Sequence, residues 1–405
     1  MTVYETRRGI SPYLAAGIVV LALAIGGAVG FVMTRTSSAA SPPSQSKTGS
    51  SGRTGGSGGT GGSSSSSTTT KPTAVPLAVR SITPAANSVN VDPSAPIKVT
   101  FSAAVSSSGV TPRLSPSAPG RWRAVGDVLT FTPIAGFLPS TEVTVTVPAG
   151  KAGVRGADGG MLKSRVVEHF HVKAGSILRL QQLLSLLDYS PLSWQPSGTA
   201  IAPTDRAAQT EALVSPPAGS FAWRQQGWPS QLLALWKPGQ YNVFTKGLVM
   251  SFEADHGLVP KGIVNRALWR SLIGAIAAHT VNTGGYNYAL GNKQNPESLT
   301  VWHDGQVVIK TPANTGIASS PTVDGTFPVY SRLRSQVMKG TNPDGSHYAD
   351  LVQYVAYFNG NDAVHYMPRP DYGIPQSLGC IELPLASAAK VWPYLAYGTL
   401  VSVIK

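Results

Sequence analysis

The sequence is poor in cysteine and in acidic residues. Cys380 is the only cysteine among 405 residues, so the chain cannot form an internal disulfide. In an exported protein a single thiol without a partner is a candidate reactive group. Asp and Glu number 19 against 32 Lys and Arg, which gives a net charge of +13. The basic residues do not cluster as in a nucleic-acid-binding surface, so we expect no nucleic-acid partner; general solubility or an anionic cell envelope explains the charge.

Charged residues are absent from the whole of residues 9–34. This apolar run is about as long as the ~20 residues that span a bilayer. Arg7 and Arg8 precede it, which predicts a cytoplasmic N-terminus and an exported remainder. We therefore expect a cytoplasmic tip and a transmembrane anchor over residues 1–35, in a single-pass protein of the cell membrane. The alternative is a cleaved signal peptide, because Ser38–Ala40 has the small-x-small pattern, but the length of the run favours an anchor.

Residues 36–76 contain no acidic side chain and consist mainly of Ser, Gly and Thr. Such a composition cannot bury enough apolar surface to fold, so it predicts a flexible linker.

Short strands separated by turns are predicted over residues 77–172, where Val143–Val147 alternates clearly and Val89–Val91 is a further strand. About seven strands in this length indicate an immunoglobulin-like β-sandwich. The segment resembles bacterial Ig-like domains in Pro84–Val89, in Phe101-Ser102 and in Leu138–Thr141. We expect a spacer role for this domain. His169 and His171 share a strand face and are either two metal ligands or, more simply, a surface pair.

Helical patterns replace the strands over residues 173–280. They predict helices at 177–187, 247–254 and 267–277. Leu180-Gln181, Phe252–Leu258 and Gly262–Val264 resemble the three-helix peptidoglycan-binding repeat, although Glu253 and Lys261 depart from its usual residues. An insert at 190–241 separates the first helix from the second. Its four tryptophans are either sugar-stacking residues or packing residues: Trp194, Trp223, Trp228 and Trp236.

The chemistry-bearing stretch lies in the last region, residues 285–405, which is rich in predicted strands. His365 precedes Cys380 there, and the prolines and glycine between them exclude a helix. A cysteine attacks as the thiolate, and a neighbouring imidazole can remove the thiol proton and later return it. The backbone N–H groups of Leu378, Gly379 and Cys380 are therefore candidates to stabilise a developing oxyanion. The plainer interpretation of a lone cysteine is a small buried hydrophobic residue.

His365 followed by Ser377-Leu378-Gly379-Cys380 resembles the L,D-transpeptidase (YkuD) family, which cross-links peptidoglycan. The segments Ser320–Val329 and Lys339–Ser346 strengthen the likeness, the second being similar to an actinobacterial subgroup. Two residues depart from the pattern of many members, because Leu378 stands where they have His and Glu382 where they have Asn or Arg. The second departure leaves the substrate contacts at that position open.

The resemblance implies that Cys380 is the nucleophile and His365 the base, with the imidazole oriented by the backbone carbonyl of Tyr366. Asp362 and Asp371 are alternative orienting groups. Ser377 is expected to fix the loop or to bind substrate. Arg332, Arg334 and Lys339 lie in a polar segment that is either a lid over the site or a solvated loop.

The sequence thus predicts a mainly β, multidomain protein with an N-terminal transmembrane helix, an Ig-like sandwich, a small helical peptidoglycan-binding domain and a β-rich catalytic domain. The resemblance implies a transpeptidase that forms 3→3 cross-links between peptidoglycan stem peptides in the cell wall, is inhibited by carbapenems and needs no metal or other cofactor. Two alternatives stay open, a carboxypeptidase-type hydrolase on the same thioester and a non-catalytic wall-binding protein.

Overall fold

The computed structural model describes residues 74–405. The predicted transmembrane segment and almost all of the predicted linker lie outside these residues. Within residues 74–405 no helix is long and apolar enough to cross a membrane.

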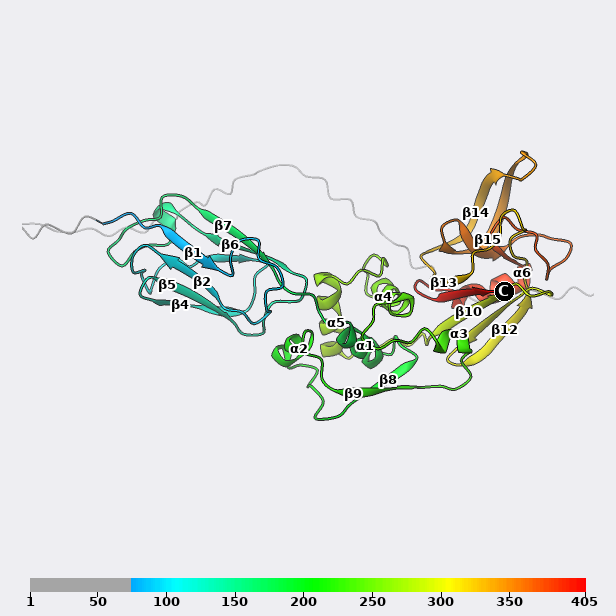
Figure 1. Cartoon of the computed structure of the whole chain (residues 1–405), viewed down its shortest axis with the longest axis horizontal. Coiled ribbons are helices and arrows are strands. Elements are labelled where there is room, and N and C mark those ends of the chain that lie inside the picture. Colours follow the sequence, from blue (N-terminus) through cyan, green and yellow to red (C-terminus); the bar gives the residue numbers. More distant parts are fainter. Residues whose placement is uncertain (1–73) are drawn as a thin grey trace, which may run out of the picture. The chain divides into compact units, whose positions relative to one another are not determined.

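The first part of the described chain is a β-sandwich of two sheets (Figure 1). One sheet has the order β1-β2-β5-β4 and the other β3-β6-β7. The strands are β1 (Val79–Thr83), β2 (Ile97–Phe101), β3 (Arg113–Ser115), β4 (Gly120–Val125), β5 (Val128–Pro133), β6 (Glu142–Val147) and β7 (Val166–His171). The period-two pattern predicted at 143–147 is present in β6, where Val143, Val145 and Val147 are fully buried between the sheets. The predicted sandwich is therefore confirmed.

The prediction of a strand at Val89–Val91 is wrong. Only Val91 pairs, in an isolated bridge with Val172, and Val89 is exposed. Asn87 and Asn90 each have φ of 58°, a left-handed conformation that interrupts an extended strand.

His169 and His171 lie on β7. The half-exposed imidazole of His169 contacts Thr144 and Glu142 at the surface.

The second part is helical, as predicted. Its helices are α1 (Ile177–Leu186), α2 (Arg206–Ala212), α3 (Ser230–Leu233), α4 (Val243–Asp255) and α5 (Arg266–Ala278). Ser176, Asn242 and Asn265 cap α1, α4 and α5, because each side-chain oxygen accepts a hydrogen bond from a first-turn N–H. The insert adds α2, α3 and a two-stranded sheet of β8 (Leu192–Pro196) and β9 (Gly219–Trp223).

The tryptophans of the insert pack into this helical core. Trp194 and Trp228 are each only 6% exposed. Trp223 and Trp236 both pack edge-on against the Phe244 ring, with centroid separations of 6.3 and 5.6 Å. These contacts favour packing over an open sugar-stacking platform.

The third part contains two sheets (Figure 1), which enclose an apolar core of their own. The first sheet, in the order β12-β11-β10-β18-β13, is built from β10 (Asn287–Asn292), β11 (Ser298–His303), β12 (Gln306–Pro312), β13 (Gly325–Pro328) and β18 (Leu400–Ile404). The second, in the order β14-β15-β16-β17, is built from β14 (Ser331–Thr341), β15 (His347–Asn359), β16 (Asp362–Tyr366) and β17 (Ile381–Leu383). Helix α6 (Leu385–Val391) follows β17 and begins after Pro384, a residue that suits the start of a helix.

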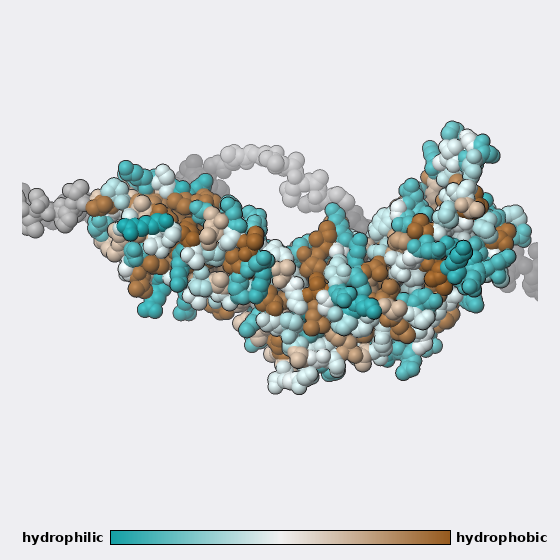
Figure 2. Space-filling model, in the orientation of Figure 1, coloured by the Kyte–Doolittle hydropathy of each residue, from teal (hydrophilic) through white to brown (hydrophobic). Residues whose placement is uncertain are grey.

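The polar segment after residue 330 is a strand and not a loop. Strand β14 pairs with β15 over most of its length, and Figure 1 shows this hairpin extending beyond the rest of the domain. Its outer end is hydrophilic in Figure 2. The alternation of apolar residues is weak here because much of β14 has no core to face, so only the pairing with β15 defines the strand.

We predict that Trp269→Ala strongly destabilises the helical region. Trp269 is fully buried in its core, and truncating a buried tryptophan typically costs about 3–5 kcal/mol. The loss is measurable by chemical denaturation of the full-length protein followed through the helical circular dichroism signal. Arg270→Ala, at the exposed next position of α5, is the matched control and should change the free energy of unfolding by less than about 0.5 kcal/mol. Equal effects of the two substitutions would contradict the packing described here.

Candidate active site

Cys380 is the last residue of an irregular loop, residues 367–380, which lies between strands β16 and β17. This segment is called the cysteine loop below. Strand β17 runs parallel to β16, with Glu382 opposite His365 and Ile381 opposite Val364. Paired residues point to the same face of a sheet, and so do residues two apart along a strand. Cys380 therefore lies on the face of His365, displaced along the strand by about two residues or roughly 7 Å.

The other side of the cysteine loop is held by residues 313–317, a segment without a regular strand. Asn314 and Glu382 exchange two backbone hydrogen bonds, each 2.9 Å long. The carbonyl of Thr315 accepts from the N–H groups of Gln376 and Ser377. Since the loop is bonded on both sides, the position of Cys380 is fixed by backbone contacts and not by its own side chain.

A buried carboxylate anchors that supporting segment. Both oxygens of Glu297 accept 2.6 Å hydrogen bonds from Thr315, one from its N–H and one from its hydroxyl. The side chain of Asn314, which is fully buried, accepts from the N–H of Gly373 and donates to the carbonyl of Asp371. These three anchoring residues were not predicted from the sequence, because nothing in the local pattern distinguishes them from ordinary loop residues.

Ser377 is 1% exposed, and its hydroxyl is engaged within the cysteine loop. It donates to the carbonyl of Cys380 at 2.6 Å and accepts from the N–H of Gly379 at 3.2 Å. This geometry favours the first of its two expected roles, fixing the loop. Gly379 has φ of +119°, and a Cβ there would lie 2.5 Å from a carboxylate oxygen of Asp362. Only glycine fits this turn.

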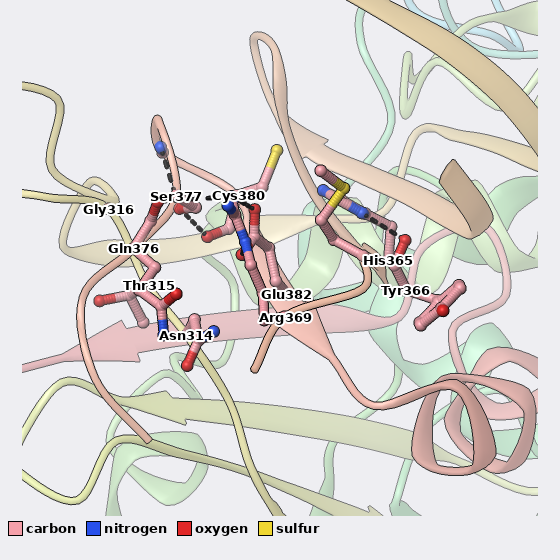
Figure 3. Close-up of polar contacts among 12 residues, drawn as sticks. Asn314, Thr315, Gly316, His365, Tyr366, Arg369, Gln376, Ser377, Cys380 and Glu382 are labelled. Atoms are coloured by element: carbon pink, nitrogen blue, oxygen red, sulfur yellow. Dashed lines mark hydrogen bonds and ion pairs between the residues drawn. The ribbon is translucent and has the colours of Figure 1, made fainter. Parts of the chain in front are cut away.

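The contact expected between His365 and the backbone carbonyl of Tyr366 is present. Nδ1 of His365 lies 3.0 Å from this oxygen, as the dashed line in Figure 3 shows. A carbonyl can only accept, so Nδ1 carries the proton and Nε2 is left with a free lone pair. No hydrogen bond joins the imidazole to the carboxylates of Asp362 or Asp371 in the described residues. The Asp362 carboxylate accepts instead from the side chain of Asn359.

His365 and Cys380 line one cavity of about 800 Å³. No hydrogen bond joins their side chains in the described residues; the thiol of Cys380 instead lies 3.7 Å from the carbonyl of Asn361. The β14–β15 hairpin also lines the cavity, through residues that include Lys339 and Tyr357. Arg332 and Arg334 do not line it and stack on Trp392 instead.

Burial keeps both groups uncharged. It raises the pKa of Cys380 to about 12, and the nearby carboxylates of Asp362 and Glu382 act in the same direction. Burial also lowers the pKa of His365, which is 3% exposed, below its usual range. At neutral pH the site therefore holds a thiol and a neutral imidazole, which is a base able to accept the thiol proton during attack.

Glu382, the second departure from the family pattern, is the partner of Arg369. The guanidinium donates two 2.8 Å hydrogen bonds to the two carboxylate oxygens, one from Nε and one from Nη2. Glu382 is 4% exposed and adjoins the cavity (Figure 3). The sequence holds a signal for this ion pair, because a glutamate between Ile381 and Leu383 in a buried strand requires a cation as its partner.

We predict that Arg369→Met lowers the free energy of unfolding by about 3–5 kcal/mol, because it leaves the buried Glu382 carboxylate without a partner. The double variant Arg369→Met/Glu382→Met should recover most of this loss, since no charge is left uncompensated. Denaturant unfolding of full-length variants measures both effects.

The matched control is Asp324→Asn, which breaks the more exposed ion pair with Lys293 in the same domain. We expect a change of less than about 1 kcal/mol there. A double variant as unstable as Arg369→Met alone would show that the ion pair is not the cause.

Comparison with protein-family models gives two matches. Residues 73–171 match a bacterial Ig-like domain, and residues 287–403 match the L,D-transpeptidase catalytic domain. Comparison with curated proteins finds no match.

Several solved structures are similar to this chain. An L,D-transpeptidase from Mycobacterium smegmatis is 17% identical, with coverage of 82% of this chain and 100% of that one and a TM-score of 0.27. L,D-transpeptidase 3 from Mycobacterium tuberculosis is 16% identical, with coverage of 81% and 99% and a TM-score of 0.27. The catalytic domain of an E. faecium L,D-transpeptidase is 27% identical, with coverage of 29% and 96% and a TM-score of 0.27.

All three TM-scores lie below 0.5, so the assignment of the domains rests on the family models. The Ig-like domain and the family resemblance expected from the sequence are thereby confirmed. The chain carries a bacterial Ig-like domain at residues 73–171 and, at residues 287–403, a catalytic domain of the L,D-transpeptidase (YkuD) family.

Proposed function

We propose that this protein is a cysteine-dependent peptidoglycan L,D-transpeptidase that forms 3→3 cross-links between stem peptides. The observation that carries the proposal is geometric: Cys380 and His365 line one large cavity, and the contact of Nδ1 of His365 with the Tyr366 carbonyl leaves Nε2 free to act as a base, in a segment that matches the L,D-transpeptidase catalytic domain.

In the first half-reaction Cys380 attacks the carbonyl that joins the third residue of a donor tetrapeptide stem to its terminal D-alanine. Nε2 of His365 accepts the thiol proton as the C–S bond forms. The tetrahedral oxyanion is held by backbone N–H groups. Leu378 and Cys380 are the stronger candidates, because the N–H of Gly379 already donates to Ser377. Collapse breaks the C–N bond, and the imidazolium gives its proton to the departing amine of D-alanine.

In the second half-reaction the side-chain amine of another stem attacks the thioester. His365 takes a proton from this amine, the C–S bond breaks, and the proton returns to the sulfur of Cys380. Water in place of the amine gives hydrolysis, so the acceptor determines whether the thioester is transferred or lost. No metal or organic cofactor takes part in these steps.

The remaining domains fit an enzyme that works on the cell wall. We assign a spacer role to the Ig-like domain and peptidoglycan binding to the helical region of residues 173–280. The substrate lies outside the cytoplasm, so the catalytic domain acts there. Residues 9–34 supply the proposed membrane anchor.

We predict that imipenem acylates the full-length protein on Cys380. One L,D-transpeptidase has been solved in complex with this carbapenem. Intact-mass spectrometry should show one covalent adduct on the native protein and none on Cys380→Ala. A folded native protein that forms no adduct would favour the non-catalytic wall-binding alternative. Incubation with a tetrapeptide stem, with and without an amine acceptor, then separates transfer from hydrolysis.

We predict that the acylation rate is constant from about pH 8 down to below pH 6.5, because the lowered pKa of His365 keeps the imidazole neutral in that range. The rate should fall only at more acid pH, as His365 becomes protonated. Stopped-flow measurement of imipenem acylation gives this profile.

The variant His365→Gln is the control for this profile. Its residual rate should depend on free thiolate and so rise about tenfold per pH unit from pH 7 to 9, since the pKa of Cys380 is about 12. A plateau in this variant at neutral pH would mean that His365 is not the base.

A further inference from the structure

The cavity at Cys380 has a surplus of negative charge, although the whole chain has a net charge of +13. Two cationic side chains and three carboxylates line it: Lys339, Arg369, Asp344, Asp350 and Glu382. The thiol and the imidazole add no charge at neutral pH, because burial keeps both of them neutral. Such a cavity favours a cationic ligand over an anionic one.

Two of the three carboxylates already have partners in the protein. Glu382 accepts both of its hydrogen bonds from Arg369. Asp344, at the tip of the β14–β15 hairpin, accepts from the N–H and the hydroxyl of Ser346, at 2.9 and 2.6 Å. The carboxylate of Asp350 takes part in no ion pair within residues 74–405. Asp350 therefore carries the surplus charge.

The strand pairing directs Asp350 into the cavity. Asp350 on β15 lies opposite Met338 on β14, and Val352 lies opposite Gln336. All four residues line the cavity, and residues two apart on a strand share one face of the hairpin. Asp350 is half-buried, so a ligand in the cavity can reach its carboxylate. Lys339 is the next residue after Met338, but no ion pair joins it to Asp350.

The hydroxyl of Tyr348 relates Asp350 to the reacting sulfur. Tyr348 lines the cavity two residues before Asp350, on the same face of β15. Burial raises the pKa of this hydroxyl, and the nearby Cys380 and Asp350 act in the same direction. One hydroxyl is thus within electrostatic range of both groups, so Asp350 faces the space in which the thioester forms.

We propose that Asp350 attracts and holds the acceptor of the second half-reaction, which arrives as an ammonium group on a stem side chain. The proposal rests on the proposed function and names the residue that selects the acceptor. An alkyl amine is mostly protonated at neutral pH, so an unpaired carboxylate draws it into the cavity. The ammonium gives one proton to water before it attacks the thioester, and His365 takes the next proton as the C–N bond forms.

This role gives the acceptor an advantage over water. A water molecule carries no charge and gains nothing from the field of Asp350, whereas the ammonium group becomes concentrated beside the thioester. Asp350 therefore favours transfer over hydrolysis, without taking part in the bonds that form and break.

The binding test uses full-length Cys380→Ala protein, which cannot form the thioester, and isothermal titration calorimetry. The probe is a tripeptide stem with a free side-chain amine, which lacks the terminal D-alanine and so can only be an acceptor. The matched ligand is the same tripeptide with this amine acetylated. We expect the acetylated tripeptide to bind about tenfold more weakly or worse, because it lacks the charge.

Variants of Asp350 in the same Cys380→Ala protein locate the interaction. Asp350→Asn should weaken binding of the amine tripeptide about tenfold and leave it no tighter than the acetylated one. Asp350→Glu keeps the charge and should restore most of the affinity. Asp324→Asn removes a carboxylate of the same domain that does not line the cavity, so it should change the affinity less than about twofold.

Transfer kinetics give a second readout with the cysteine in place. The donor is a tetrapeptide whose own amine is acetylated, and the tripeptide is the acceptor. Asp350→Asn should raise the KM for the acceptor about tenfold and lower the ratio of transfer to hydrolysis, while kcat at saturating acceptor changes much less.

The proposal is overturned if neither tripeptide binds, if both bind equally well, or if Asp350→Asn binds the amine tripeptide as tightly as its parent. Imipenem acylation of the native protein tests the catalytic proposal separately. An adduct on Cys380 combined with an inert Asp350→Asn substitution would remove only the acceptor role, whereas a missing adduct would remove the catalytic one.

Discussion

The cysteine loop has no regular structure, and its position depends on backbone hydrogen bonds from two sides. Strand β16 pairs with β17 on one side, and residues 313–317 hold the loop on the other. The buried carboxylate of Glu297 in turn fixes Thr315 in that segment. The position of the Cys380 thiol is therefore set by the backbone and does not depend on the conformation of a long side chain. The rigidity of the site comes from the sheet that it borders.

Burial has opposite consequences at the two proposed catalytic groups, yet both consequences favour the same chemistry. It raises the pKa of the thiol and lowers that of the imidazole, so neither carries a charge before substrate arrives. The protonated thiol of Cys380 and the neutral imidazole of His365 then coexist over a wide pH range. Proton transfer is coupled to attack on the substrate and does not precede it.

Two arginines of low exposure, Arg369 and Arg179, are held by different kinds of partner. Next to Cys380, Arg369 is matched by Glu382, and the pair ties the cysteine loop to strand β17. In the helical region Arg179 is held by neutral amides alone. The first arrangement is complete within the protein. The second has no carboxylate partner among residues 74–405, and burial lowers the pKa of Arg179 to about 10.

The sequence alone determined much of this protein. Alternation in Val143–Val147 and the helical patterns are local signals, and each reflects a backbone preference that acts over a few residues. The pairing of His365 with Cys380 was expected from the family resemblance. The tertiary structure decided the rest. Strand β14 exists because β15 pairs with it, and the roles of Glu297, Asn314 and Arg369 depend on partners at least 13 residues away. Such contacts are set by how the sheets pack, which no short stretch of sequence encodes.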